Sequence, residues 1–466
     1  MASNTMAMAG NTTIPHYDPG DVSWVLTSTA FVWLMIPGIG YFYSGMSRSK
    51  NALSLIMLSV ISVAIVSFQW FFWGFSFTYS KTSTNPFIGD FSNAFFRGVN
   101  TSPSMGNPKV PDVVFAVYQS MFASFTPALA IGSVAERGRL LPTIIFIFIW
   151  TTIVYDPIAY WTWNTNGWSN KMGVLDFAGG TPVHISSGAA SLAYALILGK
   201  RQGHGTEEFK PHNMAHVVLG TAFLWFGWFG FNGGSAVAGD IRAAMACLVT
   251  NLAASVGGLT WMLMDYRIER KFSALGFCSG VVVGLVTITP ASGFVGPASA
   301  VAFGIIGCIT CNFACNLKHA FNYDDALDIF AVHGVGGFVG NILTGIFAES
   351  YIAALDGSTV IAGGWVNGHF TQILYQLADA CAGMTYSFVV TYSILFLMDK
   401  IPGLSLRVDA ETEIKGIDVS EIGELAYYHV DKILVIDSKT HETKFVEQIR
   451  NGNNNKVADF SRLNNV

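Results

Sequence analysis

Long apolar runs, separated by short polar segments, recur along the chain as far as residue 398. A helix needs about 17–25 consecutive apolar residues to cross a bilayer. The runs reach that length, and together they predict an all-α integral membrane protein. We expect eleven membrane-spanning helices, at about 22–45, 52–80, 110–135, 140–163, 176–199, 214–239, 243–264, 273–290, 297–317, 328–348 and 373–398.

The composition agrees with this pattern. The 466 residues are 52% hydrophobic and 12% charged, whereas a soluble domain carries about 25% charged residues. The formal net charge is −5 and no basic block occurs, so we expect a lipid bilayer as partner and no nucleic-acid binding. Residues 1–22 contain no Lys or Arg and no apolar run, which is unlike a signal peptide.

The distribution of Lys and Arg predicts the orientation of the chain. Connections after odd-numbered spans carry eleven of these residues, and connections after even-numbered spans carry five. Because basic residues favour the cytoplasmic side, we expect an extracellular N-terminus (1–21), a transport domain (22–398) and a cytoplasmic tail (399–466). Asn11 and Asn100 each begin an Asn-X-Ser/Thr sequence on the outer side and are candidate glycosylation sites.

The spans form two similar groups of five. The first span contains "WLMIPGIGYFYSG" and the sixth contains "FLWFGWFGFNGGS", while the fifth contains "TPVHISSG" and the tenth "FAVHGVGG". Since five is odd, the two groups must lie in opposite orientations. We therefore predict inverted repeats over spans 1–5 and 6–10, an architecture of transporters, with span 11 outside the repeat.

Two histidines lie at membrane depth, whereas the other eight lie in loops or tails. His184 and His333 occupy matching places in the two repeats. A single helix histidine is most often a hydrogen-bonded packing residue, but ionisable residues inside a membrane are functional candidates. A neutral imidazole offers one donor and one acceptor, so the pair could pass a small polar molecule or a proton.

Aromatic residues with a nearby hydroxyl form a second unusual group. Tryptophan and tyrosine near a membrane surface are usually interfacial anchors. Combined with a hydroxyl acceptor, aromatic faces instead make a cation site, in which each contact contributes about 0.5–2 kcal/mol. The candidates are Tyr118, Phe122, Trp163, Trp228, Phe231 and Ser235.

No metal or cofactor site is expected. The six cysteines all lie in apolar segments, so we expect free thiols. Cys308, Cys311 and Cys315 share a helix face, and we interpret them as small residues that pack against a neighbouring helix. His212 and His216 have i, i+4 spacing without a third ligand, so a loop role is preferred. We expect no enzymatic activity.

With these residues the chain resembles the ammonium transporter family (Amt/Mep/Rh), and its fungal methylammonium-permease branch most closely. The resemblance extends from about Trp24 to Tyr428 and depends on "PGIGYFYSG", "AERGR", "LDFAGGTPVHISSG", "GWFGFNGGSA" and "DDALDIFAVHGVGG". It implies a homotrimer in the plasma membrane. Each subunit would have its own pore for ammonium (NH4+) and methylammonium.

The resemblance also implies roles for individual residues. An outer site formed by Phe122, Trp163 and Ser235, with Tyr118 beside it, would recruit the cation. Phe122 and Phe231 would stack as a gate, and His184, His333 and Trp228 would line the pore. Asp176 would hold the site in shape and favour the cation without touching it. Asp156 is a departure from the family pattern. We expect it to be solvated near a helix end, with attraction at the vestibule as the alternative.

The tail segment "EIKGIDVSEIGELAYY" resembles the family's regulatory segment. Gly416 stands at the family's glycine position, and Asp418 follows it. The resemblance implies docking on the inner pore mouth and a cytoplasmic kinase or regulator as partner. Beyond it, "HVDKILVIDSKTHETKFVEQIR" alternates like a strand, and Ser438 and Ser461 are candidate phosphorylation sites.

Solvation favours one mechanism. A bare ammonium ion in an apolar pore would cost several kcal/mol or more, whereas ammonia is neutral. We therefore expect ammonium to be deprotonated after recruitment, with ammonia crossing the pore and the proton relayed separately. Three alternatives are an ammonium sensor, a membrane metalloenzyme and a proton-coupled carrier. The last two would require metal-ligand clusters or paired charges in the pathway, and the sequence has neither.

Overall fold

The computed structural model describes residues 16–427, 430–436 and 443–449. Ten helical segments in this part of the chain are long and apolar enough to cross a membrane, and Ala274–Ile288 is a shorter eleventh. All eleven expected spans are therefore confirmed. The spans comprise α1 (Pro19–Met46), α2 (Ala52–Gln69), α3 (Phe75–Tyr79), α4 (Asp112–Ala130), α5 (Leu140–Trp150), α6 (Asp156–Trp163), α8 (Ser186–Leu198), α9 (Met214–Trp228), α10 (Ile241–Glu269), α11 (Ala274–Ile288), α12 (Pro297–Ala314), α14 (Gly336–Phe347) and α16 (Gln372–Asp399).

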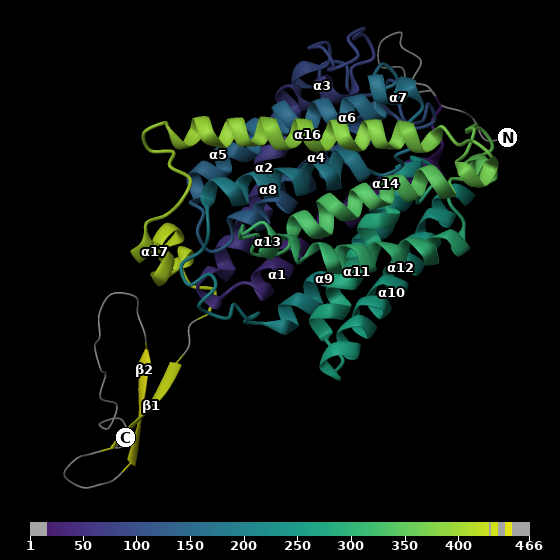
Figure 1. Ribbon diagram of the computed structural model, residues 1–466. Coiled ribbons are helices and arrows are strands. Elements are labelled where there is room, and N and C mark those ends of the chain that lie inside the picture. Colours follow the sequence, from purple (N-terminus) through teal and green to yellow (C-terminus); the bar gives the residue numbers. More distant parts are fainter. Residues whose placement is uncertain (1–15, 428–429, 437–442, 450–466) are drawn as a thin grey trace, which may run out of the picture.

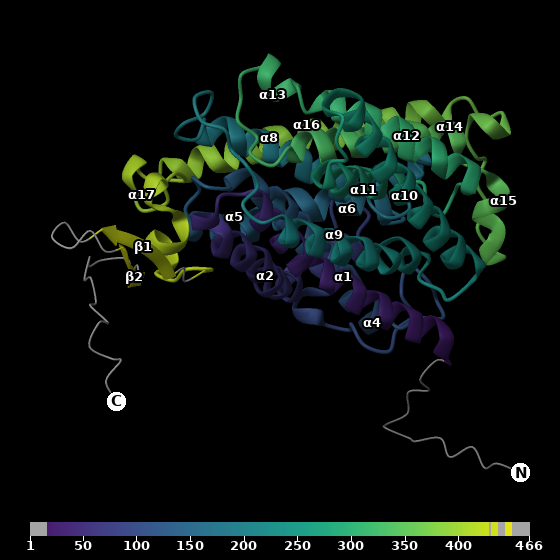
Figure 2. The same ribbon diagram turned by 90° about the horizontal axis from the view of Figure 1, so that it is seen from below.

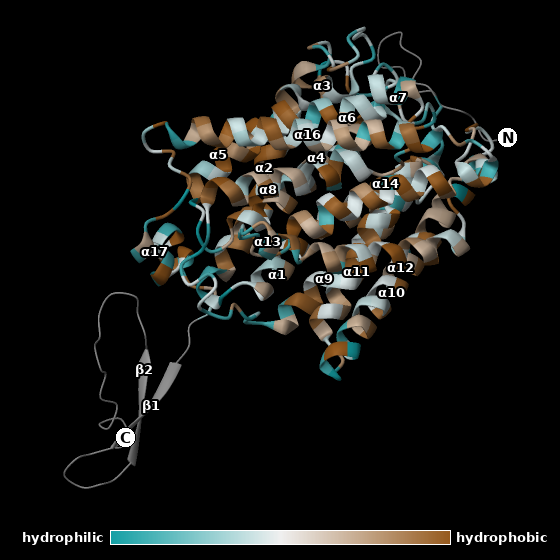
Figure 3. Cartoon of the chain, in the orientation of Figure 1, coloured by the Kyte–Doolittle hydropathy of each residue, from teal (hydrophilic) through white to brown (hydrophobic). Residues whose placement is uncertain are grey.

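The spans lie side by side in one bundle (Figure 1). Hydrophobic residues cover the middle of the helices, and hydrophilic residues gather at the two ends and around α17 (Figure 3). At one end, here called the tail end, lie α17 (Ala410–Lys415) and the strands β1 (Val430–Ile436) and β2 (Thr443–Ile449). At the opposite end lies α15 (Ser350–Ala353), as Figure 2 shows. Two further short helices, α7 (Trp168–Met172) and α13 (Leu317–Ala320), lie in connections.

Small residues let several spans approach closely. A Cβ added at Gly280, in α11, would lie 2.4 Å from the carbonyl oxygen of Gly257 in α10. Cys308 of α12 meets the same carbonyl, with its Sγ at 3.2 Å. All six thiols are free. The interpretation of Cys308 as a packing residue is thus confirmed.

Five spans contain a π-helical turn, in which one extra residue widens the helix and redirects its side chains. Such turns are rare in helices generally and are frequent at functional sites. Three of them contain Phe231, His184 and His333, and the other two adjoin Gln69 and Asp156. The turns are η2 (Trp70–Gly74), η5 (Thr151–Tyr155), η6 (Gly180–Ile185), η7 (Phe229–Gly233) and η9 (Phe330–Val335).

The structure corrects the expectation for Asp156. This residue is the first of α6, yet its side chain is fully buried and receives a hydrogen bond from Gln69 at 2.7 Å. It is therefore neither solvated nor part of the vestibule surface. Asp379 of α16 is a second buried carboxyl, bonded by the Ser169 hydroxyl. The histidine pair is thus accompanied by more ionisable side chains at membrane depth than the sequence indicated.

The tail packs on the segment that links α1 to α2. Asp418 accepts hydrogen bonds from the backbone N–H groups of Leu53 (2.9 Å) and Ser54 (2.8 Å). These are N–H groups of the first turn of α2, which have no partner within the helix. Gly416 adopts φ +112°, and a Cβ there would lie 2.7 Å from the Lys50 carbonyl oxygen.

A second tail contact involves His212 and His216. The Tyr427 hydroxyl lies 3.2 Å from His212 Nε2 and 3.2 Å from His216 Nδ1. The two histidines therefore contact the tail. Beyond this point β1 and β2 pair as an antiparallel hairpin, which confirms the strand-like alternation.

A buried ion pair joins two connections at the tail end. The Asp324 carboxylate accepts hydrogen bonds from Nε and Nη2 of Arg201, each at 2.9 Å. Burial alone would raise the pKa of Asp324, but the hydrogen bonds and charge of Arg201 outweigh it, so the pKa lies below its usual range.

We predict that Gly416→Ala weakens tail docking. The added Cβ would collide with Lys50 and the residue would have to leave its φ of +112°, at a cost of roughly 1–3 kcal/mol. The measurement is the rate at which protease cleaves the tail of the purified protein, which should rise. Gly423→Ala is the matched control, since Gly423 also has positive φ (+83°) but nothing lies within 4 Å of an added Cβ. Equal acceleration in both variants would mean that backbone strain, not the Lys50 contact, decides the result.

A second prediction concerns Asp324→Asn. Breaking one side of a buried pair costs roughly 3–5 kcal/mol, so the melting temperature of the purified protein should fall at neutral pH. Because the folded-state pKa is lowered, the pair's contribution is present above the unfolded-state pKa of about 3.9 and is lost as pH falls through the folded value. Acid should therefore lower the melting temperature of the variant less than that of the intact protein. Glu208→Gln, which removes an exposed pair with Lys210, should change little.

Candidate functional site

A pocket opens at the end of the bundle opposite the tail. Trp163, the last residue of α6, and Ser235 both line it. The Trp163 indole Nε1 donates to the backbone oxygen of Asp176 at 3.1 Å, which fixes the ring. Ser235 Oγ donates to the Phe231 carbonyl at 2.9 Å, and the Tyr118 hydroxyl lies 3.4 Å from Ser235. The pocket is completed by Tyr79, Met105, Gly106, Phe115, Gln119, Thr165, Phe177 and Val237.

Two stacked phenyl rings lie next to this pocket. Phe122 of α4 and Phe231 of η7 are fully buried, with ring centroids 4.1 Å apart and planes 25° apart. Phe122 also meets Trp163 edge-on at 6.0 Å. Residues that are far apart in the sequence are thus brought into one aromatic group. Neither phenylalanine lines the pocket itself, so the phenyl stack lies next to the pocket and not in it.

The two membrane-depth histidines are in direct contact. Nδ1 of His184 lies 3.2 Å from Nδ1 of His333, and the rings are 5.3 Å apart. His184 also stacks on Trp228 at 5.5 Å and lies 6.2 Å from Phe231. Its Nε2 is buried without a hydrogen-bond partner. The structure therefore joins the aromatic group and the histidine pair into one continuous row.

Acidic residues eight positions upstream precede both histidines. Asp176 accepts hydrogen bonds from the N–H groups of Gly179 (2.8 Å), Gly180 (2.7 Å) and Thr181 (2.7 Å), at the start of η6. Asp325 accepts one from the N–H of Phe330, at the start of η9. Each carboxylate thus compensates N–H groups at a helix N-terminus. Burial, and then the charge of Asp328, raises the pKa of Asp325 to about 6.

Asp325 was missed from the sequence, although the equal spacing Asp176–His184 and Asp325–His333 is visible there. The correspondence extends the match between the two repeats. It also explains how the histidine side chains are oriented, because each histidine follows a helical turn whose first N–H groups are bound by the upstream aspartate.

Glycines permit the two histidine-bearing spans to cross. A Cβ at Gly188, in α8, would lie 2.2 Å from the backbone nitrogen of Gly334. A Cβ at Gly337 would lie 2.9 Å from the Cβ of His184. Larger residues would separate the spans, so this contact holds the imidazoles within hydrogen-bond distance.

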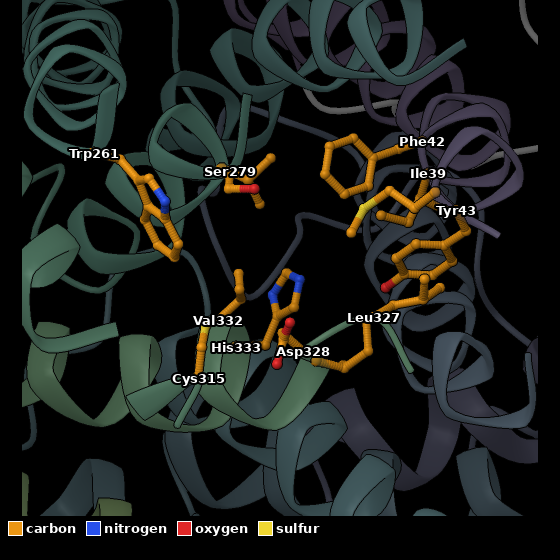
Figure 4. Close-up of a pocket in the computed structure, with 13 residues that line it drawn as sticks. Ile39, Phe42, Tyr43, Trp261, Ser279, Cys315, Leu327, Asp328, Val332 and His333 are labelled. Carbon is orange, nitrogen blue, oxygen red and sulfur yellow. The ribbon is translucent and has the colours of Figure 1, made fainter. Parts of the chain in front are cut away.

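A second pocket lies on the tail side of the histidines. His333 faces it together with residues from segments that are distant in the sequence (Figure 4). The lining is largely apolar and contains one acid, Asp328, which pairs with Lys318 at 2.8 Å. None of the tail residues that the structure describes is among its lining residues. The lining residues are Ile39, Phe42, Tyr43, Met46, Trp261, Ser279, Val282, Cys315, Leu327, Asp328, Ile329, Val332 and His333.

In order along the bundle, the row consists of the first pocket, the phenyl stack, His184, His333 and the second pocket. Over residues 16–427 and the two strands, no group of three or more His, Cys, Asp or Glu side chains could hold a metal ion. The contacts of the two histidines are with each other and with the rings of Trp228 and Phe231.

Comparison with known proteins identifies the family. A family model described as the Ammonium Transporter Family matches residues 23–427. Ammonium transporter 1 of Schizosaccharomyces pombe is 58% identical over 416 residues, which cover 89% of this chain and 84% of the relative. Ammonium transporter MEP2 of Saccharomyces cerevisiae is 50% identical over 420 residues, 88% of this chain and 84% of the relative.

Solved structures give the same result. The crystal structure of Candida albicans Mep2 superposes with a TM-score of 0.81 and 48% sequence identity, and the match covers 85% of this chain and 88% of the other. The resemblance to the fungal branch is confirmed. The chain belongs to the ammonium transporter family.

Proposed function

We propose that the chain transports ammonium and methylammonium through the row of aromatic and imidazole side chains. The observation that supports this most directly is the contact between His184 and His333 at 3.2 Å, between two pockets at opposite ends of the bundle. The route between the pockets is made of rings and neutral hydrogen-bonding groups. Such a lining suits a small polar molecule without charge.

Recruitment would take place in the pocket of Trp163 and Ser235. In the pocket, the face of Trp163 would attract a cation and Ser235 Oγ could accept one of its N–H groups. Phe122 and Tyr118 do not line the pocket, so they would contact the ion only once it moves on toward the phenyl stack. Asp176 does not line this pocket. Its charge, already bonded to three backbone N–H groups, favours the cation from behind while it holds the start of η6 in place.

Passage would require removal of a proton. The stacked Phe122 and Phe231 leave an ion no polar partner, and a desolvated cation is costly at this depth. Desolvation also favours the neutral form of a base, so ammonium would release its proton on the recruitment side. Ammonia would then pass between the rings and form hydrogen bonds with His184 and His333. The imidazole pair would relay the proton separately. Potassium has no proton to release and would be excluded.

The resemblance also supports an assembly and a location. We propose a homotrimer in the plasma membrane, with the N-terminus outside and the tail, including Gly416 and Asp418, as a cytoplasmic regulatory segment open to a kinase. Asn100 is exposed and remains a glycosylation candidate. Asn11, Ser438 and Ser461 lie outside the described residues.

The test is ammonium-evoked current and methylammonium uptake in cells that lack their own ammonium transporters. We expect saturable transport that potassium does not inhibit. His184→Ala and His333→Ala should each reduce transport or its selectivity by about 100-fold or more, the scale expected when one proton-transfer group is removed. His319→Ala, in the exposed helix α13, is the matched control and should transport normally.

Two results would contradict the proposal. One is normal, potassium-insensitive transport in both pore variants, which would remove the imidazoles from the mechanism. The other is intact protein at the cell surface that moves neither substrate. That result would favour the alternative of an ammonium sensor whose main role is signalling.

A further inference from the structure

The side chain of Gln119, in α4, has no hydrogen-bond partner. Gln119 lines the first pocket together with Trp163 and Ser235. The residue is 8% exposed, and its Oε1 is buried without a partner. Among the side-chain hydrogen bonds of the residues that the structure describes, none involves either atom of this amide. A polar group therefore faces the pocket with its hydrogen-bonding capacity unused.

Gln119 differs in this respect from the other buried amide side chains. A buried polar group without a hydrogen bond is costly, and such groups are rare in proteins. Each of the other buried Asn and Gln side chains in the described part of the chain makes at least one hydrogen bond. They are Asn51, Gln69, Asn164, Asn232, Asn341, Gln372 and Gln376. Packing within the bundle thus gives no reason for an amide at position 119.

Gln119 lies between the pocket and the phenyl stack. Phe115, Gln119 and Phe122 are spaced i, i+4 and i+7 along α4, so they share one face of the helix. Phe115 lines the pocket, and Phe122 stacks on Phe231 with ring centroids 4.1 Å apart. The amide is therefore the polar group that precedes the stacked rings on this face of α4, by about one helical turn.

The amide can present an acceptor to the pocket. The oxygen and nitrogen of a primary amide have nearly the same shape, and a half-turn about the last side-chain torsion exchanges them. In Gln119 this half-turn breaks no hydrogen bond, because neither atom has a partner. Oε1 is buried, so the side chain meets the pocket through the rest of the amide, and the half-turn brings the oxygen toward the pocket.

A neutral oxygen at this place suits ammonium. The ion is a hydrogen-bond donor only, and hydrogen bonds from a charged donor are stronger than neutral ones. The pocket has a volume of about 140 Å³, which holds the ion with several waters, so size alone does not select it. Trp163 offers the face of its ring and Ser235 its Oγ, and a second oxygen replaces one further water. Because the amide has no charge, it orients the ion without holding it as an ion pair would.

We propose that Gln119 is a further recruitment residue, whose amide oxygen accepts an N–H of ammonium and directs the ion from Trp163 and Ser235 toward the phenyl stack. This role rests on the proposed function, because it assigns Gln119 to the same site. The ion then reaches Phe122 already oriented, with one N–H held by the amide.

The test compares Gln119→Leu with the intact protein by ammonium-evoked current in cells that lack their own ammonium transporters. Leucine fills similar space without an acceptor. The half-saturating ammonium concentration should rise about tenfold, the scale of one hydrogen bond to a charged group. The maximal current should stay within about twofold, because Phe231, His184 and His333 are unchanged. Gln202→Leu makes the same exchange at an exposed position near the tail and should change neither value.

Gln119→Glu separates hydrogen bonding from packing. It keeps the acceptor oxygens and the shape of the side chain and adds a negative charge, so the half-saturating concentration should fall below that of the intact protein. The proposal is wrong if Gln119→Leu leaves this concentration unchanged, or if both variants lower only the maximal current, which would indicate a packing role. If Gln119→Leu is absent from the cell surface, Gln119→Glu decides, and any result other than a lower half-saturating concentration contradicts the proposal.

Binding to the purified protein separates this proposal from the proposed function. Ammonium chloride, with choline chloride keeping the ionic strength constant, should raise the melting temperature of the intact protein saturably. Gln119→Leu should require about tenfold more ammonium for the same rise. Intact protein that binds ammonium but transports none would contradict transport, and weaker binding by the variant would still support the role of Gln119. Normal transport by the intact protein, with equal affinity in the variant, would contradict the role of Gln119 alone.

Discussion

A bilayer core offers no water to backbone groups, so a span that departs from regular helix must satisfy its N–H and C=O groups within the protein. The five π-turns meet this constraint. They insert one residue without ending the helix, and so turn Phe231, His184 and His333 toward one another. Asp176 and Asp325 then compensate the N–H groups where two of these turns begin. The row of rings depends on these local departures, because regular helices would place the same side chains on other faces.

Two buried or half-buried ion pairs lie at the two ends of the bundle. At the tail end Arg201 is paired with Asp324. At the opposite end Arg242 pairs with Asp356 at 3.0 Å and lies 4.8 Å from the ring of Phe177, which lines the first pocket. Without Asp356, this guanidinium would repel a cation near the proposed recruitment site. The pairing therefore stabilises the connections and also limits the positive potential around the route.

The sequence predicted the features that depend on the length of the apolar runs and on the rarity of ionisable residues within them. Apolar runs defined the spans, and the scarcity of ionisable residues at membrane depth singled out His184 and His333. The contact between the two histidines could not be predicted from the sequence, because it depends on how closely Gly188 approaches the backbone of Gly334. Asp156 was misjudged because its place near a helix end indicated solvent, whereas its side chain is buried directly after the π-turn η5. The second pocket could not be foreseen, since its lining comes from segments far apart in the sequence.

Asp418 caps α2 from outside that helix, since the carboxylate belongs to a residue more than 360 positions later. Releasing the tail would therefore expose two backbone N–H groups of a membrane span to whatever replaces the carboxylate. By linkage, any ligand or modification that favours the released tail must destabilise the first turn of α2. Conversely, any change that unfolds this turn must weaken tail docking by the same free energy. The other end of α2 carries Gln69, which donates a hydrogen bond to Asp156, so this single helix connects the tail with a buried carboxyl of α6.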